Sequence, residues 1–217
     1  MSLIRLLLAC LILLVWAPVF AQEFPEWIEY MDRQELFQIN FPGQPTVTES
    51  SYKTQSGETV PAKVYTAKDG PAIYSLTVVN YRGSEAVDYR GSTDWAAWNF
   101  RRRGGEVTFD AHAVTDWIVG HQLQITNPDG TRSYIGIHPH MRRLYIMEAT
   151  APPGYPPPSD FPQTISILDE QGRAIRYELD DEGNRVRRIF ADEQYREEFR
   201  HLEGANEARP LERPPSE

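Results

Sequence analysis

The chain contains a single cysteine, Cys10, which lies in the apolar segment at the N-terminus. The rest of the chain therefore cannot form a disulfide, use a thiol nucleophile, attach haem or build a cysteine-based zinc site. It also lacks a Gly-x-Ser-x-Gly nucleophile elbow, a phosphate-cradling glycine loop and a dinucleotide-binding fingerprint. These absences favour a protein without catalytic residues and without a cofactor.

Basic residues are also few. The chain carries 22 basic and 31 acidic residues, a formal net charge of −9. Nucleic-acid binding depends on Lys and Arg side chains that replace counterions along the phosphate backbone. Attachment to anionic lipid headgroups needs the same excess of positive charge. The composition therefore argues against both kinds of partner.

The N-terminal segment has the pattern of a secretory signal peptide. Arg5 supplies a short cationic region, residues 6–20 form an apolar run, and residues 19–21 end in Ala21, where a leader peptidase can cut. The apolar run is shorter than the roughly 20 residues that cross a bilayer, which favours cleavage over a retained anchor. We therefore predict a periplasmic or secreted protein with no stable membrane span after signal cleavage.

The remaining chain is long enough for one domain with an ordinary hydrophobic core. We predict a signal peptide over residues 1–21, a single α+β domain over 22–180, and a charged tail over 181–217. In the tail, Tyr195 and the apolar residues that follow it at helical spacing, Phe199 and Leu202, predict a marginal helix. The proline-rich end after it is typical of disorder.

Alternation of apolar and polar residues predicts most of the secondary structure as strands. Turn residues such as those of Pro128-Asp129-Gly130 separate them. The predicted strands cover residues 36–41, 60–65, 73–81, 107–111, 121–127, 133–138, 144–149 and 173–177.

Two segments have helical character instead. The first runs from Asp94 to about Arg103, with Ser92 or Thr93 as its N-cap. The second is a short helix that starts at Ser159 or Asp160 and ends at residue 168. This order of elements predicts an α+β fold, an antiparallel β-sheet with helices packed on one face.

Several short motifs together suggest a family. They are Phe37-x-Ile39-x-Phe41-Pro42-Gly43-x-Pro45, Tyr74-x-Leu76-x-Val78, Gly120-His121-Gln122-Leu123, Arg143-Leu144-Tyr145-Ile146 and Leu168-Asp169-x-x-Gly172. In the first two motifs the chain resembles small extracytoplasmic proteins with a PsbP/Mog1-like α+β fold, and in the other three a family of uncharacterised proteobacterial secreted proteins. The resemblance covers roughly residues 24–178 and implies accessory, binding or assembly roles, with no catalytic motif to transfer.

His138-Pro139-His140 is the strongest candidate for a metal site. Residues i and i+2 of a strand point to the same face, so the two imidazoles can reach one zinc or copper ion. In the alternative, Pro139 ends the strand and both histidines lie on a solvated turn. Neighbouring strands offer further ligands, namely His121 first, then His112, Glu148 and Asp110.

Two Tyr-Arg pairs lie eight residues apart, each followed by Gly-Ser, and a third basic pair follows the histidines. Arginine offers a two-pronged donor for a carboxylate or phosphate, and tyrosine offers a flat face with a hydroxyl group. The alternative is an ordinary surface loop that leads into a helix. The predicted ligand-binding residues are Tyr81, Arg82, Tyr89, Arg90, Arg142 and Arg143.

Together these features predict a non-catalytic binding or accessory protein of the bacterial envelope. Its partner would be an envelope protein or a small anionic ligand that contacts the arginine and tyrosine side chains. The alternative is a periplasmic zinc- or copper-binding protein, or a metal-dependent hydrolase, that uses His138 and His140.

Overall fold

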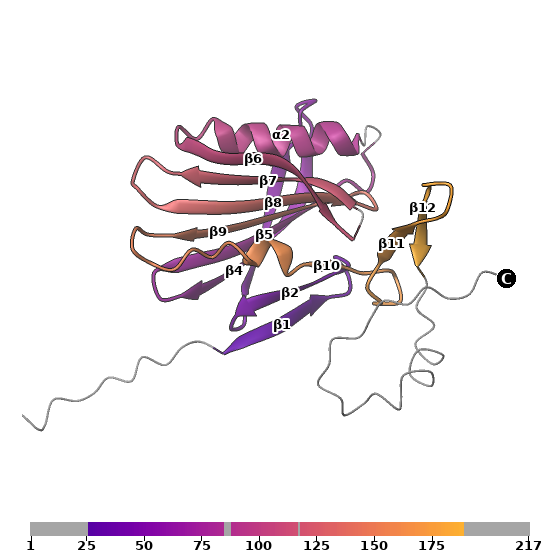
Figure 1. Ribbon diagram of the computed structural model, residues 1–217, viewed down its shortest axis with the longest axis horizontal. Helices are drawn as coiled ribbons and strands as arrows, with labels where there is room; N and C mark the ends of the chain where they lie inside the picture. The colour runs from indigo at the N-terminus through magenta and orange to yellow at the C-terminus, as the bar shows by residue number, and fades with distance from the viewer. Residues whose placement is uncertain (1–25, 85–87, 117, 189–217) are drawn as a thin grey trace, which may run out of the picture.

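Seven strands form one antiparallel sheet in the order β3-β4-β5-β9-β8-β7-β6 (Figure 1). The computed structural model describes residues 26–84, 88–116 and 118–188. The strands are β3 Thr46–Lys53, β4 Thr59–Asp69, β5 Ala72–Asn80, β6 Glu106–Thr115, β7 Ile118–Thr126, β8 Arg132–His140 and β9 Arg143–Ala151.

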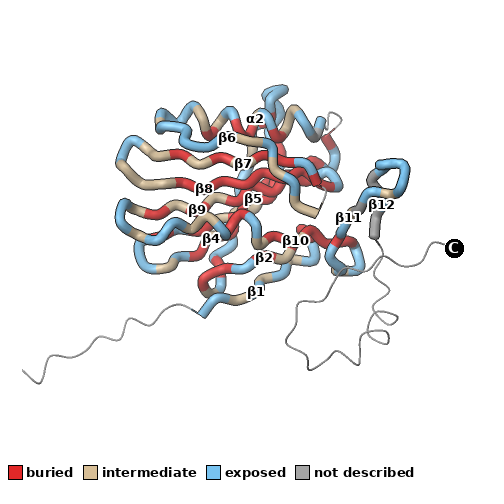
Figure 2. The backbone as a smooth tube through the Cα atoms, viewed as in Figure 1, coloured by how far each residue is buried: buried red, intermediate tan, exposed pale blue. Residues whose placement is uncertain are grey.

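The helix α2 (Tyr89–Arg101) covers one face of this sheet. Ala96, Ala97 and Phe100 pack against apolar side chains of the central strands, such as Leu123 and Ile137. The edge strands β3 and β6 are mostly exposed, while β8 and β9 are buried along most of their length (Figure 2).

A second, smaller sheet covers the opposite face. Its strands β1 (Trp27–Asp32), β2 (Phe37–Pro42) and β10 (Ser166–Ile167) run in the order β1-β2-β10. The inward side chains of β2 (Phe37, Ile39 and Phe41) form a core with Tyr145 and Met147 of β9. The 3₁₀ turn η2 (Phe161–Gln163) adds a buried phenyl ring to this core. The main sheet therefore lies between a helix and a second sheet.

The strands β11 (Arg176–Leu179) and β12 (Arg185–Arg188) form a separate antiparallel hairpin. None of the helices in the described ranges is long and apolar enough to cross a membrane. The predicted signal peptide and the helix predicted around Tyr195 lie outside the described residues.

The structure confirms the predicted antiparallel sheet. The prediction that more than one helix packs on it is wrong for the described residues, where α2 alone covers one face. The segment predicted as a second helix, 159–168, forms η2 and then β10, whose Ile167 pairs with Phe37 of β2. Ile165 and Ile167 are both buried, a spacing of two that suits a strand added to the open edge of β2. The domain is thus richer in β structure than the sequence analysis predicted.

The start of α2 also differs from the prediction. The N-cap is Asp88, whose carboxylate accepts from the backbone N–H of Arg90 at 3.0 Å. Ser92 and Thr93, the predicted caps, lie inside the helix. Aspartate ranks with serine among the strongest N-cap residues, so the first suitable residue in the segment starts the helix.

Candidate functional site

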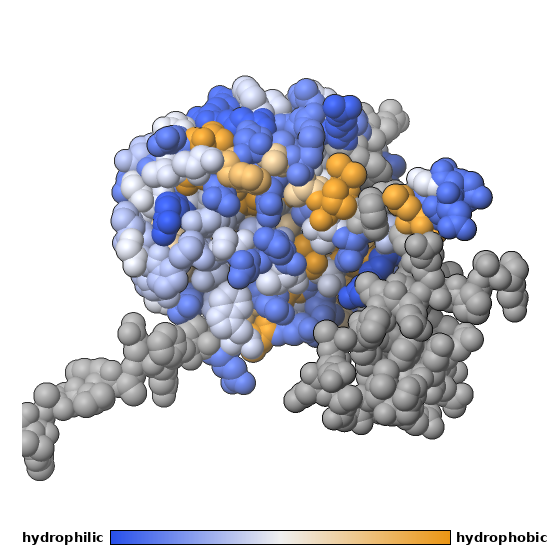
Figure 3. Space-filling view, viewed as in Figure 1, coloured by the Kyte–Doolittle hydropathy of each residue, from blue (hydrophilic) through white to orange (hydrophobic). Residues whose placement is uncertain are grey.

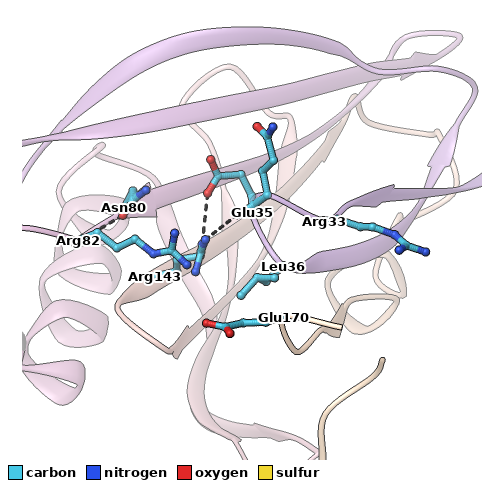
Figure 4. A pocket seen from close by; sticks show the side chains of 8 residues that line it. Arg33, Glu35, Leu36, Asn80, Arg82, Arg143 and Glu170 are labelled. Atoms are coloured by element: carbon cyan, nitrogen blue, oxygen red, sulfur yellow. Dashed lines mark hydrogen bonds and ion pairs between the residues drawn. The ribbon is translucent and has the colours of Figure 1, made fainter. Parts of the chain in front are cut away.

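A polar pocket of about 520 Å³ lies where four loops and strand ends meet on the side of the sheet that carries β1 and β2. Its volume is within the range of small-molecule binding sites. The pocket is lined by Arg33, Gln34, Glu35, Leu36, Asn80, Arg82, Arg143 and Glu170 (Figure 4).

Arg143, the first residue of β9, lies beneath this pocket. It lies on the same face of the strand as Tyr145 and Met147, so its side chain points toward the core, and only 1% of its surface is exposed. Its Nη2 donates to the carbonyl oxygen of Gln34 at 2.6 Å, and its Nε donates to Oε2 of Glu35 at 3.2 Å. Its Nη1 is buried and has no hydrogen-bond partner among the described residues. The guanidinium group is therefore held firmly but incompletely satisfied.

Glu35 links Arg143 to a second cation. Its Oε1 lies 2.9 Å from Nζ of Lys63 on β4, and the hydrogen bond between these groups raises the pKa of Lys63. Asp32 fixes the backbone of the β1–β2 turn, because its Oδ1 accepts from the N–H groups of Gln34 and Glu35. Both oxygens of the Glu35 carboxylate are thus engaged by cations of the protein.

Arg82 lies in the tight turn that follows β5. The backbone N–H of Arg82 donates to Oδ1 of Asn80 at 2.9 Å, and the N–H of Ser84 donates to the carbonyl of Tyr81 at 3.1 Å. Gly83 has φ +91°, a left-handed conformation that disfavours other residues. The turn is therefore built from local hydrogen bonds, while the Arg82 side chain stays exposed.

The far wall of the pocket comes from the loop between β10 and β11. Oδ1 of Asp169 accepts from the backbone N–H groups of Gln171 and Arg173, at 3.0 and 2.8 Å, and fixes this loop. Glu170 is the exposed residue next to it. Within the described ranges, the Glu170 carboxylate has no ion pair with any of the arginines.

Positive charge dominates the base of the pocket. The guanidinium groups of Arg82 and Arg143 lie next to each other in Figure 4. Both lie close enough to affect the phenol of Tyr145. Burial raises the pKa of this phenol, and the positive charges of Arg143 and Arg82 act in the opposite direction. Two like charges in a partly buried site repel each other unless an anion lies near both. The arrangement can therefore hold a carboxylate or a phosphate group.

Of the six predicted ligand-binding residues, the structure brings Arg82 and Arg143 together at this pocket. Tyr81 is 3% exposed and packs into the core under α2, so it cannot face a ligand. Arg142 donates to the carbonyl oxygens of Tyr81 and Ser84 and so supports the turn that carries Arg82. These two residues position the site rather than line it.

Arg90 lies elsewhere, at a more apolar hollow of about 600 Å³ beside the start of α2. Apolar side chains interrupt the mostly hydrophilic surface near the ends of β6 and β7 (Figure 3), and exposed Val119 belongs to this hollow. The structure describes Tyr89 as the first residue of α2 but not its side chain.

The structure does not bring His121 to the predicted histidine pair. His121 pairs with Ile137 across β7 and β8, so it shares a face with Ile137, and His138 points to the other face. On the helix side, Nε2 of His121 lies 2.6 Å from Oδ1 of Asp110, and Arg101 of α2 contacts the same carboxylate. This ion pair with Arg101 is the main reason why the pKa of Asp110 falls to about 2.

His138 and His140 share the face that carries β1 and β2. Pro139 does not end the strand, because β8 continues to His140 and pairs with β9 there. His138 is 2% exposed, its Nε2 lies 3.2 Å from Oγ1 of Thr115, and burial lowers its pKa to about 4. The ring of His140 meets that of Tyr177 at 5.9 Å. The described residues contain no group of three or more side chains placed to hold a metal ion.

The sequence analysis did not identify Arg33, Glu35, Asn80 and Glu170, which line the pocket. It also did not identify Lys63, which pairs with Glu35. One signal was available for the site: Arg143 directly precedes the apolar run of residues 144–147, which is typical of a strand buried on both faces. A buried arginine requires a carboxylate partner. The identity of that partner depends on how the two sheets stack.

Among solved structures, the chain is similar to the solution structure of cyanobacterial PsbP (CyanoP) from Synechocystis sp. PCC 6803. The sequence identity is 9% and the TM-score is 0.46, and the match covers 71% of this chain and 99% of that chain. This similarity concerns the fold alone, and the weak PsbP-like resemblance of the sequence is consistent with it. No family model matches the chain, and no curated protein matches it.

Proposed function

We propose that the protein is a non-catalytic binding protein of the bacterial envelope that captures a small anionic ligand between Arg82 and Arg143. The observation that carries the proposal is the buried Nη1 of Arg143, a charged donor without a partner among the described residues. A buried donor left unsatisfied costs about 1–3 kcal/mol, and more when the group is charged. A ligand oxygen at this position would recover that cost.

Arg82 supports the same proposal. It is exposed, and its side chain has no ion pair among the described residues. It can therefore move with a ligand and cover it from the solvent side, while Arg143 binds from below. Guanidinium groups form two-pronged contacts with carboxylates and phosphates, which suits a ligand held between two of them.

The chemistry of the pocket favours binding over catalysis. Arginine stays protonated in proteins and does not serve as a general base near neutral pH. The Glu35 carboxylate is engaged by Lys63 and Arg143 and is therefore poorly available to a ligand. A location in the periplasm or outside the cell is part of the proposal and depends on the signal-peptide pattern of the first 21 residues.

The proposal is tested by titration of the purified protein with N-acetyl-L-alanine and, separately, with inorganic phosphate, followed by backbone amide NMR signals. We expect saturable shifts at residues 33–36 and 80–84. Arg82→Gln should weaken binding about tenfold, the loss of one charge-assisted hydrogen bond. Arg90→Gln is the matched control, because it removes the same charge outside this pocket.

The outcomes separate clearly. Equal weakening by Arg82→Gln and Arg90→Gln would show that only the net charge of the protein matters. Shifts centred on the hollow that contains Arg90 would place the anion at the wrong site. Either result would overturn the proposal.

A further inference from the structure

The pocket holds opposite charges on opposite sides. Arg82 and Arg143 lie together at one side, and the carboxylate of Glu170 points toward them from the loop across the pocket (Figure 4). Arg33 points away from this pair. The pocket therefore has a positive and a negative side within one volume of about 520 Å³.

This separation of charge is fixed by the backbone. The Glu170 loop is held by Asp169, whose carboxylate also accepts from Nε of Arg173 at 2.9 Å. Arg33 lies against the same loop. Its Cζ would be 3.4 Å from a Cβ atom placed on Gly172, which is van der Waals contact. Arg82 is held by its own turn on the other side. Glu170 and Arg82 thus come from two loops that are held by separate hydrogen bonds, and Arg143 comes from the start of β9.

An anion alone does not account for Glu170. A carboxylate beside an anion site repels the ligand and weakens its binding. The same carboxylate becomes favourable if the ligand carries a positive group at its other end. Glu35 cannot take this role, since Lys63 and Arg143 already engage it.

From this geometry we infer that the ligand is a small zwitterion, an α-amino acid or a short peptide. Its carboxylate binds between Arg82 and Arg143, and its ammonium group faces Glu170. The inference rests on the proposed function, because it assigns a ligand class to the same pocket. The volume accommodates a dipeptide with room for its side chains.

The test compares two ligands that differ at their N-terminus: L-alanyl-L-alanine, which carries an ammonium group, and N-acetyl-L-alanyl-L-alanine, in which a neutral acetamide replaces it. Each is titrated into the purified protein and followed by backbone amide NMR signals. The free dipeptide should bind about three- to fivefold more tightly, the upper part of the range expected for one exposed ion pair. In Glu170→Gln this preference should disappear. Glu182→Gln removes the same charge in the β11–β12 turn, outside the pocket, and should keep the preference.

Equal affinity of the two peptides for the wild-type protein would overturn the zwitterion inference and leave the anion site intact. A preference that survives in Glu170→Gln would overturn the role of Glu170. Absence of binding by both peptides, together with absence of phosphate binding, would overturn the proposed function itself. The two proposals therefore fail in distinguishable ways.

Discussion

Glu35→Gln tests the charge balance beneath the pocket. The substitution keeps the shape of the side chain but leaves the guanidinium group of Arg143, 1% exposed, without its carboxylate. Removal of one partner from a buried ion pair costs about 3–5 kcal/mol. Lys63 loses the same partner, but 22% of its side chain is exposed and water can replace the carboxylate. We therefore expect the lower end of the range, about 3 kcal/mol.

Two companion variants measure how much of this cost comes from the unpaired guanidinium group. Arg143→Met alone leaves Glu35 paired with Lys63 and frees one carbonyl acceptor, that of Gln34, a cost of about 1–2 kcal/mol. In the double variant, Glu35→Gln with Arg143→Met, no buried guanidinium remains. It should therefore be more stable than Glu35→Gln alone by about 1–2 kcal/mol, a strongly non-additive result.

The assay is urea unfolding at pH 7, followed by tryptophan fluorescence, on the wild type and the three variants. Phosphate should raise the unfolding midpoint of Glu35→Gln more than that of the wild type, because it can replace the missing carboxylate. The double variant controls for general salt effects. A cost below 1 kcal/mol for Glu35→Gln, or additive effects in the double variant, would refute the reasoning.

Two further predictions concern other parts of the fold. Burial holds the pKa of His138 at about 4, against 6.5 for an exposed histidine, so the unfolded chain takes up the proton first. The contribution of neutral His138 to the free energy of unfolding is fully present above pH 6.5. It falls by about 3 kcal/mol as the pH drops to 4. His138→Gln should flatten this part of the stability curve in urea unfolding, and an unchanged curve would show that His138 is not the group responsible. Asp88→Ala removes the N-cap that accepts from Arg90 and should cost about 1 kcal/mol. A thermal melting curve identical to the wild type would contradict the capping role.

The strands were the most predictable part of the fold. Residues 37–41 alternate apolar and polar side chains at a spacing of two, residues 144–147 are a continuous apolar run, and the structure confirms strands in both segments. The segment 159–168 was not predictable from local pattern. It contains too few residues for a clear period, and its last residues are drawn into a strand by the open edge of β2.

Two of the eight residues that line the pocket were predicted from the sequence. Arg82 belongs to a repeated Tyr-Arg pair and Arg143 to the basic pair that follows the histidines, and the structure places both at one pocket. Their partners come from distant turns: Glu35 is 108 residues before Arg143 in the chain. A contact of this kind depends on the stacking of β1 and β2 on the main sheet, which no local pattern reveals.

The most direct test of the anion site is the Nε–H NMR signal of the Arg143 side chain. Because Nε donates to a buried carboxylate, this signal should be resolved and protected from exchange in the free protein. On titration with N-acetyl-L-alanine, the account predicts that it shifts saturably, together with that of Arg82 and with the same dissociation constant. An Arg143 signal that stays unchanged while the ligand saturates other residues would contradict the account.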